Sequence, residues 1–148
     1  MHRLFLTCLL ALTGCNTSVE TEQRAPRPAA TATAQPLTPA PRAVRIGEGG
    51  PGFAACQSRG VVSLPDGEAA ASLQVAPFRE AATMARVAEG TVVRVCTRTL
   101  DQRWLGVVIA TTLEAGCGVG GRIDRPRDYA GPCPSGWVAT NEVRLTGN

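Results

Sequence analysis

Residues 91–98 read TVVRVCTR and alternate more clearly between apolar and polar side chains than any other stretch. Successive side chains of a β-strand point to opposite faces, so this pattern predicts a strand that is buried on one side. The two faces divide the residues into Val93, Val95 and Thr97 on one side and Arg94, Cys96 and Arg98 on the other. If the valines face the core, Cys96 faces outward, where a segment carrying Cys56 can lie across the sheet and be cross-linked.

Other short stretches indicate further strands at residues 61–64, 72–75, 104–110, 136–140 and 142–145. Turn-forming residues separate them at 65–67, 89–90 and 101–102. The run REAATMARVAEG, residues 79–90, has no clear apolar stripe, and we expect a loop or one helical turn at most there. Five or six short strands in about ninety residues predict an all-β domain, folded as a small barrel or sandwich.

Four cysteines fall in this domain, namely Cys56, Cys96, Cys117 and Cys133. An even number of cysteines in a small exported domain predicts two disulfides. Four cysteines allow three pairings, and the sequence alone does not choose between them. The simplest joins Cys117 to Cys133 across a Gly- and Arg-rich loop, and Cys56 to Cys96 across the first half of the domain. No pair has the Cys-x-x-Cys spacing of a zinc site, so a four-cysteine zinc is the weaker alternative and we expect no cofactor.

The chain begins with MHRLFLTCLLALTGC, in which a short basic start precedes an apolar run from Leu4 to Leu12. That run is too short to span a bilayer, so residues 1–14 are predicted to be a secretory signal. Its end, Leu-Thr-Gly-Cys, resembles the bacterial lipobox, which implies cleavage before Cys15 and a lipid on that cysteine. Asn16 then favours the outer membrane, with the protein facing the periplasm of the cell envelope.

The stretch after Cys15 is rich in Pro, Ala and Thr and has no apolar period. It cannot bury enough surface to offset its ordering entropy, so residues 15–43 are predicted to be a lipid-anchored, disordered linker. Residues 44–148 remain as one domain with a single modest core, which we expect to be a monomer. All fifteen basic residues are Arg, and from residue 50 onward ten Arg face nine acids. This nearly neutral balance argues against a nucleic-acid partner.

The residue inventory excludes most catalytic chemistry. The only histidine is His2, inside the signal, and the chain has no lysine. Histidine bases, Ser-His and Cys-His pairs, Schiff bases and phosphate-loop lysines are therefore ruled out. In GPCPSGWVAT, residues 131–140, Cys133 has no base beside it and belongs to a cross-link rather than to a redox site. A hydrolase based on two carboxylates remains as a remote alternative, and we expect that the protein is not an enzyme.

Four blocks in order resemble the bacterial SH3-like domain. They are SLQVAP (72–77), MARVAEGTVVRVC (84–96), RWLGVVI (103–109) and SGWVATNEVRL (135–145). Cys117-Gly118-Val119 and the Gly131–Val138 stretch resemble a cysteine-bearing exported subgroup of that family. The resemblance implies a small, disulfide-stapled SH3-like barrel over residues 44–148. The Arg-Ser-Gly-Pro element of the family is reduced here to Ala76-Pro77.

The family resemblance implies a noncatalytic envelope module that binds peptidoglycan peptide or a protein partner. Aromatic and Arg side chains would line its groove, and the candidates are Phe78, Arg79, Trp104 and Tyr129. An alternative is a periplasmic inhibitor or immunity lipoprotein that blocks an envelope enzyme through the loop from Cys117 to Cys133. That loop carries three Arg and two Asp, which suit recognition of a partner.

Overall fold

The computed structural model describes residues 40–65, 68–110 and 116–147. The signal at residues 1–14, the lipid site at Cys15 and most of the linker at residues 15–43 lie outside the described residues, as does the predicted turn at Asp66-Gly67. In the described part of the chain, no helix is both long and apolar enough to cross a membrane.

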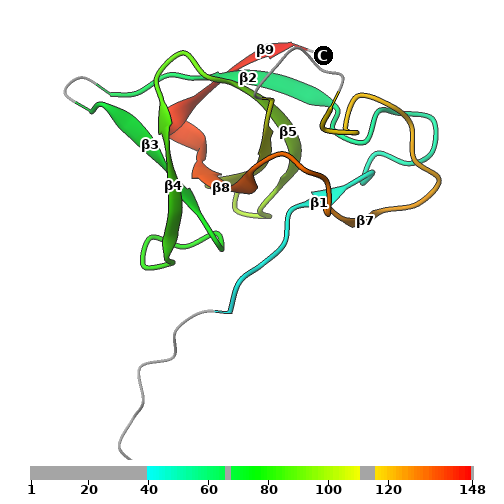
Figure 1. Ribbon diagram of the computed structural model, residues 1–148, viewed down its shortest axis with the longest axis horizontal. Helices are drawn as coiled ribbons and strands as arrows, with labels where there is room; N and C mark the ends of the chain where they lie inside the picture. Colours follow the sequence, from blue (N-terminus) through cyan, green and yellow to red (C-terminus); the bar gives the residue numbers. More distant parts are fainter. Residues whose placement is uncertain (1–39, 66–67, 111–115, 148) are drawn as a thin grey trace, which may run out of the picture. The chain divides into compact units, whose positions relative to one another are not determined.

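The described chain is all-β, as predicted, and its regular helical structure is limited to one 3-10 turn. The elements are β1 (Arg45–Ile46), β2 (Ser58–Val62), β3 (Ala70–Gln74), β4 (Thr83–Ala88), β5 (Val92–Arg98), β6 (Trp104–Ile109), β7 (Arg127–Asp128), β8 (Ser135–Ala139), η1 (Thr140–Glu142) and β9 (Val143–Gly147). Seven of these strands form one antiparallel sheet in the order β4-β3-β8-β6-β5-β2-β9, and β1 pairs with β7 in a separate ribbon (Figure 1).

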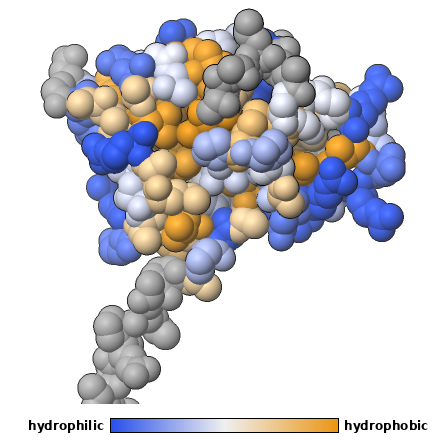
Figure 2. All heavy atoms as spheres, viewed as in Figure 1, coloured by the Kyte–Doolittle hydropathy of each residue, from blue (hydrophilic) through white to orange (hydrophobic). Residues whose placement is uncertain are grey.

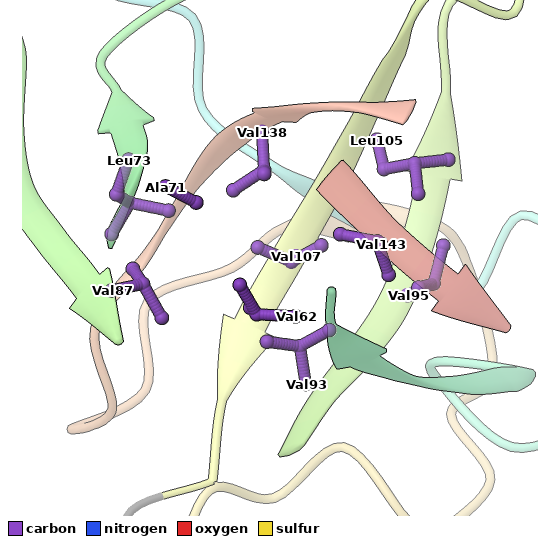
Figure 3. Packing of buried hydrophobic residues seen from close by; sticks show 10 residues of the cluster. All are labelled: Val62, Ala71, Leu73, Val87, Val93, Val95, Leu105, Val107, Val138 and Val143. Atoms are coloured by element: carbon purple, nitrogen blue, oxygen red, sulfur yellow. The ribbon is translucent and has the colours of Figure 1, made fainter. Parts of the chain in front are cut away.

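The sheet curls around a core but does not close into the predicted barrel. Among the described residues, no strand pairing joins β4 at one edge of the sheet to β9 at the other. The prediction of five to six strands was also too low, since the main sheet alone has seven. Curling is evident because every strand of this sheet places a side chain in the same buried cluster (Figure 3).

The inner core consists of aliphatic side chains on the concave face of the sheet. Its ten members are Val62, Ala71, Leu73, Val87, Val93, Val95, Leu105, Val107, Val138 and Val143. Burying a Val or Leu side chain contributes about 1.5–3 kcal/mol, so a small cluster of this kind can hold a curled sheet without aromatic residues. Val93 and Val95 of TVVRVCTR face this core, as the alternation predicted, whereas Val92 is 48% exposed.

The stretch from Thr83 to Ala88 corrects the prediction of a loop or helical turn at residues 79–90. It forms β4, which pairs with β3 and then turns at Gly90, with φ at +79°, into β5. Val87 is its one fully buried residue, and Ala85 packs against the core from a half-buried position. An edge strand with one large buried side chain, Val87, and a second large apolar side chain, Met84, that is exposed has little alternation to detect, which is why the sequence pattern missed it.

A β-bulge in β5 corrects the prediction that Thr97 shares a face with Val93 and Val95. Val95 lies opposite Val107, but the register then shifts and Thr97 lies opposite Gly106. The hydroxyl of Thr97 donates to a Glu48 carboxylate oxygen at 2.5 Å. The extra residue of a bulge reverses which face the following side chain occupies. Thr97 is buried on the outer face of the sheet, not in the core.

The outer face of the sheet carries a second apolar cluster, and both disulfides belong to it. Its buried members are Ile46, Ala55, Cys56, Val108, Cys117 and Val119. The cross-links join Cys56 to Cys96 and Cys117 to Cys133, which confirms two disulfides and the simplest of the three pairings. Cys96 faces outward from β5 and holds the segment carrying Cys56 across the sheet, as the alternation of the strand indicated.

Candidate functional site

The segment from Arg42 to Glu48, which we name the strap, crosses the outer face of the sheet. The backbone N–H of Arg42 donates to the Val75 carbonyl at 2.8 Å, next to the end of β3. At the other end of the strap, Glu48 accepts from Thr97 of β5. Val44 and Ile46 between them are each 2% exposed. Arg42, which the sequence assigned to the linker, therefore makes an ordered contact with the domain.

Trp137 lies beneath the strap rather than in the inner core. It is 1% exposed and lies opposite Gly106 in the register of β6 and β8. Its indole Nε1–H donates to the Arg42 carbonyl at 2.7 Å, and the Arg42 guanidinium lies 5.1 Å from the ring centroid. A Cβ on Gly106 would lie 3.3 Å from Val44 and 3.4 Å from Trp137. Glycine at this position leaves room for the ring and the strap.

Residues 45–57, which include the second half of the strap, and residues 116–134 form what we call the outer layer. Their backbones pair where Ala55 N–H donates to the Gly121 carbonyl at 2.8 Å and Cys56 N–H to the Val119 carbonyl at 3.0 Å. The Tyr129 N–H donates to the Val44 carbonyl at 2.8 Å. Few backbone bonds hold this layer, and the two disulfides add covalent attachment to β5 and within the 117–133 loop.

Tyr129 braces the 117–133 loop from inside. Its hydroxyl donates to the Cys117 carbonyl at 3.1 Å and accepts from the Cys133 N–H at 3.2 Å. A Cβ on Gly131 would collide with the Tyr129 ring, so the loop needs glycine there for the ring to lie against its backbone. The hydroxyl is engaged within the loop, and the ring face is what Tyr129 can offer to a ligand.

A hollow of about 290 Å³ opens beside this ring, and we name it the tyrosine hollow. It is lined by Ile46, Gly116, Cys117, Gly118, Arg127, Asp128, Tyr129, Ala130, Gly131 and Pro132. Its walls are mostly apolar, while the side chains of Arg127 and Asp128 bring opposite charges to its rim. An apolar recess with a few charged groups is the usual composition of a small-ligand site.

A second hollow of about 340 Å³, the polar hollow, lies between the strap and β5. It is lined by Glu48, Gly49, Gln57, Ser58, Val95, Cys96, Thr97 and Arg98. Arg45 lies between the two hollows, where its guanidinium is 3.6 Å from Glu48 and 3.7 Å from Asp128. These pairs are about half exposed, so each stabilises the fold little, and the single positive charge of Arg45 offsets only part of the charge of the two acids.

Three arginines of the outer layer remain without an acidic partner among the described residues. Arg122, Arg125 and Arg127 are exposed and form no ion pair with that part of the chain. Figure 2 shows hydrophilic residues, in blue, gathered over the right-hand part of the molecule, where β1 and β7 lie in Figure 1. A guanidinium presents a planar fork of N–H groups that matches a carboxylate or a phosphate.

The described hollows do not bring the four predicted groove residues together. Phe78 and Arg79 lie exposed in the loop between β3 and β4, and Trp104 is half-buried at the start of β6. Tyr129 alone lines a described hollow. The role of these residues in binding stays a prediction. Sequence reasoning did not single out Arg127, although its signal, an Arg-Pro-Arg run inside a predicted disulfide loop, was visible.

Among the described residues, two carboxyl groups depart from their ordinary acidity, and neither lines a described hollow. Hydrogen bonds from Thr99 and Arg103 lower the pKa of Asp101 to about 2. Burial, followed by the charge of Glu68, raises the pKa of Glu142 above its usual 4.5. In the ranges of the chain that the structure describes, no three His, Cys, Asp or Glu side chains gather in a way that could hold a metal ion.

Comparison of the chain with protein-family models, with curated proteins and with solved structures found no match.

Proposed function

We propose that this protein is a noncatalytic, SH3-like binding module of the cell envelope, attached to the outer membrane by a lipid on Cys15. Its ligand is a carboxylate-bearing peptide stem of peptidoglycan, bound at the tyrosine hollow. The observation that carries this proposal is the set of exposed arginines on a segment held by the Cys117–Cys133 disulfide. Arg127 in particular lies at the rim of an apolar recess.

The rigidity of the segment supports a binding role. The disulfide and the two bonds of the Tyr129 hydroxyl restrict the 117–133 loop before any ligand arrives. A preorganised loop loses less conformational entropy on binding than a mobile one, so the same contacts give a higher affinity. The pair of opposite charges at the rim suits a peptide that carries both a carboxylate and an amine, as peptidoglycan stems do.

The location and architecture rest on separate support. Two disulfides favour an oxidising compartment outside the cytoplasm. The sequence blocks that resemble the SH3-like family fall on β3, β4–β5, β6 and β8–β9, all within one curled antiparallel sheet. The lipid on Cys15 is proposed from the Leu-Thr-Gly-Cys signal end alone.

Sedimentation with isolated peptidoglycan sacculi tests the proposed function. The full chain, purified in detergent, is expected to pellet with sacculi. The Arg122→Gln/Arg125→Gln/Arg127→Gln variant is expected to bind at least about tenfold more weakly, because the loss of even one charge-assisted hydrogen bond costs about 1.5–3 kcal/mol. Arg86→Gln/Arg144→Gln is the matched control, because both of these arginines are exposed outside the outer layer and neither is a predicted groove residue. Absence of pelleting, or equal loss in the control, would overturn the proposal.

The inhibitor alternative uses the same loop, and the same purified full chain distinguishes it from the peptidoglycan-binding function. The exposed arginines on a cross-linked loop also suit an acidic patch on an envelope enzyme. If the full chain leaves sacculi in solution but co-purifies with a hydrolase and lowers its activity, the inhibitor function replaces the peptidoglycan function. Loss of that inhibition in the triple Arg variant would assign it to the loop.

A further inference from the structure

The strand β5 extends further than β2, which lies beside it. β2 begins at Ser58, opposite Val95, whereas β5 continues to Arg98. The chain that precedes β2 leaves the sheet at this point. Cys56 is held by its disulfide to Cys96 in the apolar cluster on the outer face, and its backbone N–H pairs with the outer layer. The end of β5 therefore has a neighbouring strand, β6, on one side only among the described residues.

The backbone groups of Arg98 point away from β6. The Thr99 N–H donates to the Trp104 carbonyl at 3.0 Å, and Arg98 lies opposite Leu105 of β6. Consecutive residues of an antiparallel strand turn their N–H and C=O groups to opposite sides, so those of Arg98 point to the side that β2 leaves uncovered. They have no backbone partner in the described ranges of the chain. An unpaired strand edge is a template on which an extended peptide can add.

The polar hollow lies along this uncovered edge, because residues 95–98 of β5 form part of its lining. Its other walls come from the end of the strap and the start of β2, and the Cys56–Cys96 disulfide fixes the start of β2 against β5. A Cβ on Gly49 would collide with the side-chain amide of Gln57, so glycine lets this amide lie against the strap. The amide adds both a donor and an acceptor to the wall of the hollow.

Glu48 gives the hollow a negative charge that is held in position. The hydroxyl of Thr97, which is 8% exposed, donates to the Glu48 carboxylate, while the Glu48 side chain itself is 43% exposed. Arg98 is the other charged residue of the lining, but side chains alternate along a strand, so it points to the opposite face from Thr97. Arg45 lies 3.6 Å from Glu48 and shares its charge with Asp128. The carboxylate of Glu48 is therefore able to accept from a cationic ligand.

We propose that the polar hollow binds an extended peptide that carries a primary amine. One residue of this peptide pairs with the N–H and C=O of Arg98, in the place that β2 would occupy if it continued. The ammonium group of the peptide donates to the Glu48 carboxylate. A peptide fits better than a free amine, because the strand edge requires a partner with its own N–H and C=O groups.

This peptide site is separate from the site of the proposed function. No residue of the chain lines both the polar hollow and the tyrosine hollow. The inference therefore goes beyond the proposed function and does not depend on it. The amine can belong to the N-terminus of the peptide or to a side chain, because both present the same ammonium group to Glu48.

A titration followed by nuclear magnetic resonance of backbone amides tests the inference. The full chain in detergent is titrated with acetyl-Ala-Ala-Lys-Ala-amide, with the same peptide acetylated on its lysine, and with Ala-Ala-Ala-Ala-amide that has a free N-terminus. We expect at least one amine-bearing peptide to shift the Arg98 amide saturably and to slow its exchange with solvent. The tighter of these two identifies the source of the amine.

The doubly acetylated peptide is expected to bind at least about tenfold more weakly, because it lacks the charge-assisted bond to Glu48. Equal binding of this peptide would overturn recognition of an amine. Absence of a saturable shift at Arg98 with every peptide would overturn the site, and so would shifts confined to Ala130 and Gly131, which line the tyrosine hollow.

The variant Glu48→Gln removes the charge and keeps an acceptor for the Thr97 hydroxyl. It is expected to weaken binding of the amine-bearing peptide about tenfold. Glu89→Gln is the matched control, because Glu89 is exposed in the turn at the other end of β5, and it is expected to leave binding unchanged. Equal weakening in both variants would reduce the effect to the net charge of the protein and overturn the role of Glu48. The Val107 amide of the inner core reports that both variants remain folded.

Sedimentation with sacculi separates this inference from the proposed function. Normal pelleting without a shift at Arg98 overturns this inference alone. A saturable shift at Arg98 without pelleting overturns the proposed function alone. Glu48→Gln is expected to pellet like the wild type, and a loss of pelleting in this variant would overturn the separation of the two hollows.

Discussion

The two faces of the main sheet are held by different means. On the inner face, ten aliphatic side chains from seven strands pack together without a disulfide. On the outer face, the outer layer has one ribbon of two-residue strands, a smaller apolar cluster and both cross-links. Long strands are held by many backbone hydrogen bonds and buried side chains. Short segments form few of either, and in the outer layer the disulfides add to them.

The contrast explains where charge can be placed. An arginine on the inner face would be buried without water and would cost several kcal/mol. The outer layer gains its order from covalent links as well as from a small apolar cluster, so fewer of its side chains are needed for packing and several can be exposed arginines. Cross-linking therefore allows a rigid surface with a composition that a hydrophobic core would not permit.

Removal of the Cys56–Cys96 disulfide, which anchors the outer layer to β5, is expected to have the largest effect on stability. The link closes a 40-residue separation, and Cys56→Ser/Cys96→Ser should lower the free energy of unfolding by about 4 kcal/mol, mainly because the unfolded chain gains entropy. Urea denaturation measures the loss. Leu73→Ala in the inner core is the reference and should cost about 3 kcal/mol through its cavity. A loss below about 1 kcal/mol for the double variant would mean that packing alone holds the outer layer.

Removal of the Cys117–Cys133 disulfide is expected to cost less and to act locally. The separation is 16 residues, so Cys117→Ser/Cys133→Ser should lose about 3 kcal/mol. In this variant, hydrogen exchange of the backbone amide at position 133, which donates to the Tyr129 hydroxyl, should accelerate more than exchange of the Val107 amide in the inner core. Hydrogen exchange read by NMR compares the two faces directly. Equal acceleration at both sites would show that the two faces unfold as one unit.

Much of the sheet was predictable from alternation, and the misses have physical causes. The long strand β5 and the strands β2, β3, β6, β8 and β9 all overlap stretches that the sequence indicated. β1 and β7 were missed because two residues have no period to detect. The bulge after Val95 was missed because register depends on the partner strand, which local pattern does not contain.

The candidate site was less predictable because it depends on contacts between distant segments. The number of disulfides followed from the number of cysteines, and the observed pairing is the simplest of the three that the sequence left open. The burial of Trp137 on the outer face was not visible, because it requires Arg42 and Val44 to cross the sheet about ninety residues away in sequence. The tyrosine hollow likewise forms where β1 meets the 116–132 segment, and neither segment alone carries a pocket signal.

A methyl group added at Gly106 tests how closely the strap packs against the outer face of the sheet. The Gly106→Ala side chain would press on Thr97, Val44 and the Trp137 ring, and overpacking of this kind costs about 2 kcal/mol. Thermal unfolding measures the loss. Gly116→Ala in the outer layer is the matched control, since nothing lies near its Cβ position and its φ is not positive. If both variants had the same stability, the strap would not be packed against the sheet.

The smallest effect is expected at the end of the sheet, where Glu142 is partly buried without a cross-link. Burial, and then the charge of Glu68, raises the pKa of Glu142 in the folded state above 4.5. A raised pKa favours the folded state below pH 4.5, and this contribution to stability is lost as the pH rises through the pKa of Glu142 in the folded state. Glu142→Gln should therefore raise the melting temperature at pH 7 and change it little near pH 4.

Asp101→Asn provides the control of opposite sign for this prediction. Hydrogen bonds from Thr99 and Arg103 hold the pKa of Asp101 at about 2, below its usual 3.8, so its contribution is present above pH 3.8 and is lost on acidification towards pH 2. Asp101→Asn should lower the melting temperature at pH 7. Scanning calorimetry of both variants at pH 4 and pH 7 measures the two signs. A lower melting temperature for Glu142→Gln at pH 7 would show that the backbone hydrogen bond at Ala139 and the charge of Arg86, which both lower the same pKa, outweigh burial there.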